Sequence, residues 1–277
     1  MSRTPTLLGL PYDASSSFLR GPAAAPPLIR EQLWSAATNP WSESLADISA
    51  PGSLADAGDL ELPADSAEAR ARIEAGVAAV YAAGGRVIAL GGDHSVTFPV
   101  LRAVGPRFPG LTLLHIDAHP DLNDIFEGDR FSHACPFARI LDEGLVSHLV
   151  QVGIRTLSGH QRAQADRFGV EVIDMRAWSG GARPTLSGPL YLSLDLDGLD
   201  PAFAPGVSHQ EPGGLTVRDT ITLIQNLPGP IAGADVVELN PLRDLGGTTA
   251  RVAAKLVKEI ASRMLETAGP TWELRRP

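Results

Sequence analysis

The sequence predicts an α/β protein in which residues 1–277 form a single domain, with helices on both faces of one parallel sheet. Short apolar runs alternate with longer amphipathic segments, which is typical of β-α-β units. No polar linker long enough to separate two domains interrupts this alternation, and 277 residues suit one large α/β domain. We therefore expect one doubly wound sheet.

Seven short apolar runs are expected to form the strands. A strand buried on both faces reads as a continuous apolar run rather than as an alternating one. In chain order the runs are residues 6–10, 86–90, 111–117, 149–153, 170–174, 190–195 and 231–238.

Seven amphipathic segments between these runs are expected to form the helices. They are residues 22–37, 66–83, 96–104, 133–142, 160–168, 217–225 and 248–266. The last segment gathers Ala250, Leu256 and Ile260 near one face, so it should pack against the sheet. Residues 39–63 are rich in Ser, Ala, Asp, Gly and Pro and indicate a long surface excursion, and residues 178–189 indicate a loop.

The charge balance restricts the classes of partner. Lys and Arg total 23 against 32 Asp and Glu, which gives a formal net charge of -9. An acidic surface repels nucleic acid and anionic lipid but attracts cations. No segment reaches the roughly 18 apolar residues that a membrane helix needs. We expect a small cationic ligand, and neither nucleic acid nor a membrane as partner.

Cysteine content and the first residues bear on the compartment. Cys135 is the only cysteine and cannot form an internal disulfide, which is typical of a reducing compartment. The apolar stretch near the N-terminus is much shorter than the core of a secretory signal. Together these features predict a cytoplasmic location.

Acidic residues and histidines follow three of the expected strands. Gly-Gly-Asp-His-Ser at 91–95 follows the strand at 86–90, Asp-Ala-His-Pro-Asp at 117–121 ends the strand at 111–117, and Asp-Leu-Asp at 195–197 ends the strand at 190–195. Ligands of an open parallel sheet bind beyond the carboxyl ends of its strands. We therefore expect the three clusters to meet there.

The spacing within these clusters indicates a metal centre. Alternate residues of extended backbone face the same side, so Asp117, His119 and Asp121 should converge, and so should Asp195 and Asp197. A single Asp-x-Asp is most often a solvated loop, but four buried carboxylates together need compensating positive charge. The charge of two divalent ions would balance that of four carboxylates. Oxygen and nitrogen ligands without a thiolate favour Mn²⁺ or Mg²⁺, with zinc still possible. We expect two Mn²⁺ per subunit.

The motifs also resemble a known family. GGDHS, DAHPD and SLDLDGLDPAFAPG are similar to the three signatures of the ureohydrolases, the arginases and agmatinases, and GADVVELNPLRD looks like the plant-type arginase branch. The resemblance covers nearly the whole chain. It implies a three-layer α/β/α fold with a mainly parallel eight-stranded sheet, a binuclear Mn centre, hydrolysis of a guanidino group to urea and an amine, and homotrimers or homohexamers.

The resemblance further implies which residues bind each ion. The first ion would be held by His94, Asp117, Asp121 and Asp195, and the second by Asp117, His119, Asp195 and Asp197. In this arrangement Asp117 and Asp195 would bridge the two ions. Asp93 is expected to orient His94 without binding metal.

Two further residues match catalytic positions of the family. His133 matches the histidine that moves a proton at the mouth of the site, a task suited to a group that titrates near neutral pH. Glu238 matches the glutamate that grips the guanidinium, for which a carboxylate is a good partner. The alternative for His133 is a surface or helix-start histidine, and the alternative for Glu238 is an acid at a strand end that caps Arg243.

The far end of the substrate is less well defined by the sequence. Asn123 stands where animal arginases also carry an asparagine that contacts the substrate carboxylate, which favours L-arginine over agmatine. His209 is expected either to line the same rim or to lie in a solvated loop. The predicted function is hydrolysis of L-arginine to L-ornithine and urea. Agmatinase is the first alternative, another guanidino or formimino acid hydrolase follows, and an amide deacetylase or a non-catalytic scaffold of the same fold is remote.

Overall fold

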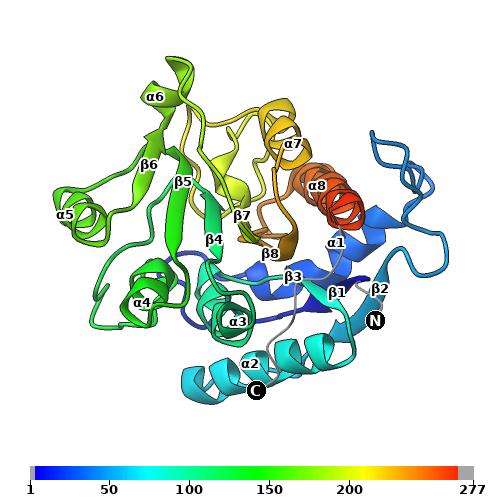
Figure 1. Ribbon diagram of the computed structural model, residues 1–277, viewed down its shortest axis with the longest axis horizontal. Helices are drawn as coiled ribbons and strands as arrows, with labels where there is room; N and C mark the ends of the chain where they lie inside the picture. The colour runs from blue at the N-terminus through cyan, green and yellow to red at the C-terminus, as the bar shows by residue number, and fades with distance from the viewer. Residues whose placement is uncertain (1–3, 268–277) are drawn as a thin grey trace.

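Eight strands form one sheet in the computed structural model, which describes residues 4–267. The order across the sheet is β2-β1-β3-β8-β7-β4-β5-β6, and every neighbouring pair is parallel (Figure 1). The strands are β1 (Pro5–Gly9), β2 (Ala55–Asp59), β3 (Arg86–Leu90), β4 (Thr112–Ile116), β5 (His148–Ile154), β6 (Glu171–Asp174), β7 (Leu190–Asp195) and β8 (Ile231–Val237).

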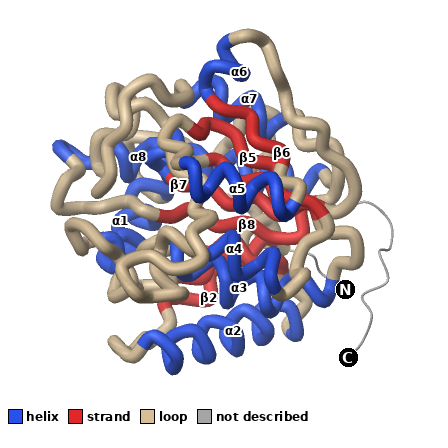
Figure 2. Tube along the Cα trace, turned by 90° about the vertical axis from the view of Figure 1, so that its left-hand side faces the viewer, coloured by secondary structure: helices blue, strands red, loops and turns tan. Residues whose placement is uncertain are grey.

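Helices cover both faces of this sheet. One face packs against α1 (Ala25–Leu33), α6 (Met175–Ser179), α7 (Val217–Gln225) and α8 (Thr248–Glu266). The other packs against α2 (Ser66–Ala82), α3 (Thr97–Val104), α4 (Pro136–Asp142) and α5 (Gly159–Phe168). Figure 2 shows the strands between α2 and α3 on one side and α7 on the other. The expected three-layer α/β/α fold is confirmed.

Burial on both faces explains the continuous apolar runs. In β1 the side chain of Leu7 belongs to the core under α1 and α8, whereas that of Leu8 belongs to the core under α2 and α3. Ile88 and Ala89 of β3 divide in the same way. Within residues 4–267 no helix is both long enough and apolar enough to cross a membrane.

Three differences from the sequence prediction bear on the edge of the sheet or on the site. Part of the expected surface excursion forms β2, an edge strand whose five residues are all exposed. Because none of them is buried, the sequence has no apolar pattern that would predict this strand. Arg30 of α1 holds this strand through ion pairs to Asp56 and Asp59. A short helix, α6, begins at Met175 and ends within the segment that was expected to be a loop.

The third difference concerns the segment that carries His133. The helix expected to start there begins only at Pro136, so His133 lies in the preceding loop. Proline is well suited to the first turn of a helix because no intrahelical hydrogen bond needs its missing N–H.

The four central strands, β3, β8, β7 and β4, are neighbours in the sheet and run in the same direction. Their carboxyl ends therefore lie side by side, although the chain reaches them far apart in sequence. In a doubly wound sheet this edge is where a ligand binds. Every cluster of acidic residues and histidines that the sequence singles out follows one of these strands.

Candidate metal centre

Three carboxylates surround one imidazole nitrogen at the centre of this edge. Nδ1 of His94, which follows β3, lies 3.1 Å from an Oδ2 atom of each of Asp117, Asp121 and Asp195. All four residues are buried. The four residues that were expected to hold the first ion are thus together.

A second imidazole lies on the other side of Asp117. Nδ1 of His119 is 3.3 Å from Asp117 Oδ1 and 3.0 Å from Asp197 Oδ2. Asp117 therefore faces both histidines, one with each oxygen, as a bridging carboxylate would. One oxygen of Asp195 faces His94, and its other oxygen accepts the backbone N–H of Asp197 at 2.8 Å.

The cluster needs positive charge. His94 Nδ1 is buried and makes no hydrogen bond, despite the three oxygens around it. Burial and the neighbouring carboxylates raise the pKa of Asp195 well above its usual value and that of Asp197 to about 7. Burial lowers the pKa of His119, but Asp197 and Asp117 outweigh it and raise the value to about 12. Protons are thus favoured where a cation would sit, and the oxygen and nitrogen donors fit a hard divalent metal.

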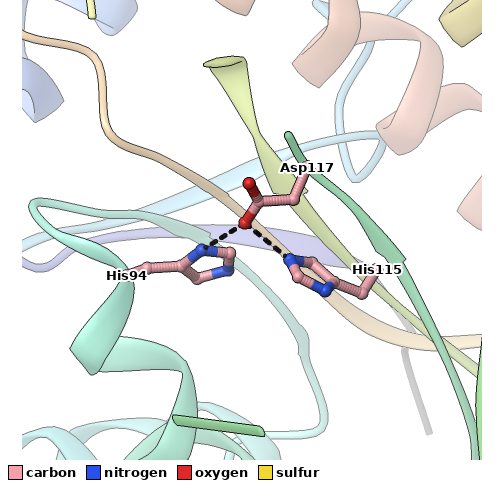
Figure 3. A group of neighbouring side chains, drawn as sticks. All are labelled: His94, His115 and Asp117. Atoms are coloured by element: carbon pink, nitrogen blue, oxygen red, sulfur yellow. Dashed lines mark hydrogen bonds and ion pairs between the residues drawn. The ribbon is translucent and has the colours of Figure 1, made fainter. Parts of the chain in front are cut away.

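His115 lies close to the centre but outside the set of available ligands. Its Nε2 is 2.7 Å from Asp117 Oδ2 (Figure 3). Its Nδ1 accepts from the amide of Gln151 at 2.9 Å. Because both ring nitrogens are engaged, His115 orients Asp117 and has no nitrogen free for an ion. Its position two residues before Asp117 on a strand is the sequence signal that could have identified it.

The two residues expected to act on the substrate are also in contact. His133 Nδ1 lies 3.0 Å from Glu238 Oε1, and its Nε2 lies 2.9 Å from the hydroxyl of Ser17. Burial lowers the pKa of His133, but the hydrogen bond and charge of Glu238 outweigh it and raise the pKa to about 9. The imidazole is thus held between two partners, and the raised pKa favours its protonated form at neutral pH. Ser17 was not expected here from the sequence.

Two side chains of the centre stand on strained backbone. Asp121 has a φ of 48° and Glu238 a φ of 65°, in the left-handed region that residues other than glycine rarely adopt. Such strain persists where the surrounding fold fixes a residue, and it is concentrated at functional sites.

The two residues expected at the substrate rim differ in position. The ring centre of His209 lies 5.3 Å from that of His133 and 5.7 Å from that of His119, so His209 is a neighbour of both imidazoles. Asn123 is half-buried and its amide nitrogen donates to the carbonyl of Ala134 at 3.3 Å.

Asp93 does not contact the ring of His94 but caps the short turn, His94–Val96, that carries it. Its carboxylate accepts hydrogen bonds from Ser95 on one oxygen and from the Ser15 and Ser16 loop on the other. The partner of the His94 ring is instead Ser193, whose hydroxyl lies 3.0 Å from Nε2. Asp93 thus fixes the loop that leads to Ser17.

Gly92, two residues before His94 in the chain, lies too close to the backbone of Tyr12 for any side chain to fit. A Cβ at this position would lie 1.8 Å from the carbonyl oxygen of Tyr12, which accepts a hydrogen bond from Asp93 N. Gly92→Ala should therefore lower the free energy of unfolding by about 1–3 kcal/mol, as overpacking does. Denaturant unfolding would measure this, with Gly159→Ala as the control because its Cβ would meet nothing within 4 Å. Equal stabilities of the two variants would contradict the prediction.

Comparison with known proteins shows close relatives among plant arginases. The chain is 46% identical to "Arginase 1, mitochondrial" of Arabidopsis thaliana over 94% of this chain and 80% of the relative. It is 44% identical to "Arginase 2, chloroplastic/mitochondrial" of the same plant, again over 94% and 80%. The solved structure of the arginase from Medicago truncatula superposes with a TM-score of 0.91 at 45% identity and covers 95% of this chain and 88% of that one.

These relatives contradict the expected cytoplasmic location. The names of both Arabidopsis proteins place them in mitochondria or chloroplasts. The inference from the lone thiol of Cys135 fails for a physical reason. A free cysteine is typical of any reducing compartment and does not distinguish one such compartment from another.

The match to a protein family covers the site as well as the fold. Residues 3–262 match the family described as "Arginase family". This range contains both imidazoles, the four carboxylates around them, and the pair formed by His133 and Glu238. The chain belongs to the arginase family.

Proposed function

We propose that this protein is a manganese-dependent arginase that hydrolyses L-arginine to L-ornithine and urea. The observation that carries the proposal is the convergence of His94, His119 and their four carboxylates beside the His133–Glu238 pair. The arginase names of the plant relatives favour L-arginine among the guanidino compounds.

The ligand set proposed for two Mn²⁺ is the one that the family resemblance implies. His94, Asp117, Asp121 and Asp195 would hold one ion, and Asp117, His119, Asp195 and Asp197 the other. When bound, two divalent ions supply positive charge and a nucleophile at neutral pH.

Glu238 is proposed to bind the guanidinium of the substrate. Hydrogen bonds from His133 and from the backbone N–H of His94 both go to its Oε1, which leaves Oε2 for a ligand. A carboxylate pairs well with a planar guanidinium and would fix the orientation of the carbon to be attacked. Asn123 and His209 are proposed to contact the other end of the substrate.

His133 is proposed to supply a proton to the leaving amine. Addition of water to the guanidino carbon is followed by cleavage of the bond to the side-chain nitrogen, and that nitrogen must take up a proton to leave as an amine. The proton that His133 carries at neutral pH is suited to this step.

Glu238→Gln should weaken the reaction with little effect on the metal. The amide keeps the shape of the carboxylate but loses its charge, and hydrogen bonds to charged groups contribute about 1.5–3 kcal/mol. We expect kcat/KM for L-arginine to fall about 10-fold to 100-fold while metal content stays at the wild-type value. Steady-state kinetics and metal analysis would measure the two quantities. An unchanged kcat/KM would show that Glu238 does not bind the substrate.

The substrate is tested by measuring urea release in the presence of Mn²⁺. L-arginine, agmatine and other guanidino acids should be compared in parallel, and L-arginine should give the largest kcat/KM. Agmatine turnover far above that of L-arginine would make the protein an agmatinase. Metal analysis should find two Mn per chain, whereas one ion would favour a deacetylase-like site.

A further inference from the structure

A chain of hydrogen bonds leads away from the candidate metal centre into the sheet. Nε2 of His94 lies 3.0 Å from the hydroxyl oxygen of Ser193 on β7, and that hydroxyl lies 2.7 Å from Oδ1 of Asp235 on β8. All three side chains are fully buried. The roles proposed above make no use of Ser193 or Asp235.

Asp235 is a buried carboxylate with three hydroxyl donors. Its Oδ1 accepts from Ser193, and its Oδ2 accepts from Tyr191 at 2.7 Å and from Thr97 at 3.1 Å. Burial raises the pKa of Asp235, while His94 and the three hydroxyls act in the opposite direction. No cation contacts this carboxylate among the ion pairs of residues 4–267.

The direction of these bonds determines which nitrogen of His94 carries hydrogen. A serine hydroxyl has one hydrogen, and Ser193 gives it to Asp235. Ser193 can then only accept from His94, so Nε2 must carry a hydrogen. When a cation occupies the space among the three carboxylates, the lone pair of Nδ1 faces it.

We propose that Asp235, acting through Ser193, is a positioning residue that selects the Nε2–H tautomer of His94 and so keeps Nδ1 available to a metal ion. The inference rests on the proposed metal role of His94 and is independent of the substrate. A partner on the second ring nitrogen is a common way to orient a metal-binding histidine.

Asp235→Asn should reverse the direction of the two hydrogen bonds that link His94, Ser193 and Asp235, which we call the relay. The oxygen of the new amide is expected to stay with the two donors Tyr191 and Thr97, which turns its NH₂ group toward Ser193. Ser193 would then donate to Nε2 of His94, and the hydrogen of the imidazole would move to Nδ1, where it competes with the metal. We expect the affinity for Mn²⁺ to fall about 10-fold to 100-fold.

Tyr191→Phe is the matched control. It removes a hydrogen bond from the same carboxylate but leaves the link between Ser193 and Asp235 intact. Its Mn²⁺ affinity, measured by titration of metal-depleted protein, should equal that of the wild type. If both variants lost affinity to the same extent, Asp235 would serve packing alone and the proposal would be overturned.

A double-mutant cycle tests whether Asp235 acts through Ser193. Ser193→Ala should itself weaken Mn²⁺ binding, and adding Asp235→Asn to it should cause little further loss. A full additional loss would show that the charge of Asp235 acts directly, which would overturn the relay. If Asp235→Asn does not fold, Ser193→Ala with wild-type affinity would overturn the proposal on its own.

A spectroscopic measurement follows the hydrogen itself. In protein loaded with diamagnetic Zn²⁺, the imidazole N–H signals of wild type and Tyr191→Phe should include a hydrogen-bonded Nε2–H of His94, assigned by its loss in His94→Gln. Asp235→Asn should lose or displace this signal, and an unchanged signal would overturn the proposal. Neither this measurement nor the titration uses a substrate, so the result stands even if no guanidino compound is hydrolysed.

Discussion

Asp117→Asn should abolish metal binding at both positions and reduce urea release from L-arginine by at least about 10³-fold. Asp117 is the carboxylate that faces both histidines, with one oxygen 3.1 Å from His94 and the other 3.3 Å from His119. The amide keeps the size of the side chain but removes the negative charge that both ions would share. A bound metal contributes several kcal/mol of transition-state stabilisation, and each 1.36 kcal/mol is a factor of ten in rate. Metal content after gel filtration and urea release would measure both effects.

Asp200→Asn is the control for this variant. Asp200 follows the same strand as Asp195, but its carboxylate accepts backbone N–H groups of Ala202 at 2.9 Å and Gly213 at 2.6 Å. We expect this variant to keep wild-type metal content with a lower melting temperature, because it weakens a turn rather than the centre. If Asp117→Asn kept two ions, Asp117 would not be the carboxylate that bridges them.

His133→Ala should retain both ions and lose about 10²-fold to 10⁴-fold in kcat, the usual contribution of a positioned acid or base. His133 has no contact with the four carboxylates among the ion pairs of the described residues, and its ring is held by Glu238 and Ser17. Because its pKa is raised to about 9, the proton it carries should be lost as the pH rises through that value. The wild-type kcat should therefore decline above about pH 9, and this decline should be absent in the variant. Steady-state kinetics across pH would measure both effects.

His148→Ala serves as the control for His133→Ala. His148 is half-buried at the start of β5, and its Nε2 lies 3.5 Å from Glu171 Oε2, away from the candidate metal centre. We expect wild-type kcat and metal content for this variant. If His133→Ala lost its metal, or kept a wild-type kcat, His133 would not be the proton donor.

The sequence predicted well the elements whose burial is visible in their own apolar residues. Strands such as β3 and β7 are buried on both faces, and their apolar runs predicted them closely. β2 escaped prediction because an exposed edge strand has no apolar pattern and is defined by its pairing with β1 and by Arg30. The start of α4 was placed too early, which put His133 on a helix instead of in a loop.

The sequence by itself determined the residues of the candidate metal centre. Asp117, His119 and Asp121 are close in the chain, as are Asp195 and Asp197, so the geometry of extended backbone was enough to predict that they converge. The rule that ligands bind beyond the carboxyl ends of parallel strands then predicted that these groups meet.

Only the tertiary structure decided which groups support that centre. Gln151, His115, Ser193 and Asp235 are direct partners in the strand register across β5, β4, β7 and β8, so they form one polar row beneath the proposed metal ligands. Contact between Ser17 and His133 likewise joins loops 116 residues apart. A local pattern shows which face a side chain takes within its own strand. Which side chain stands beside it depends on strand order and register, and these are determined by packing of the whole sheet.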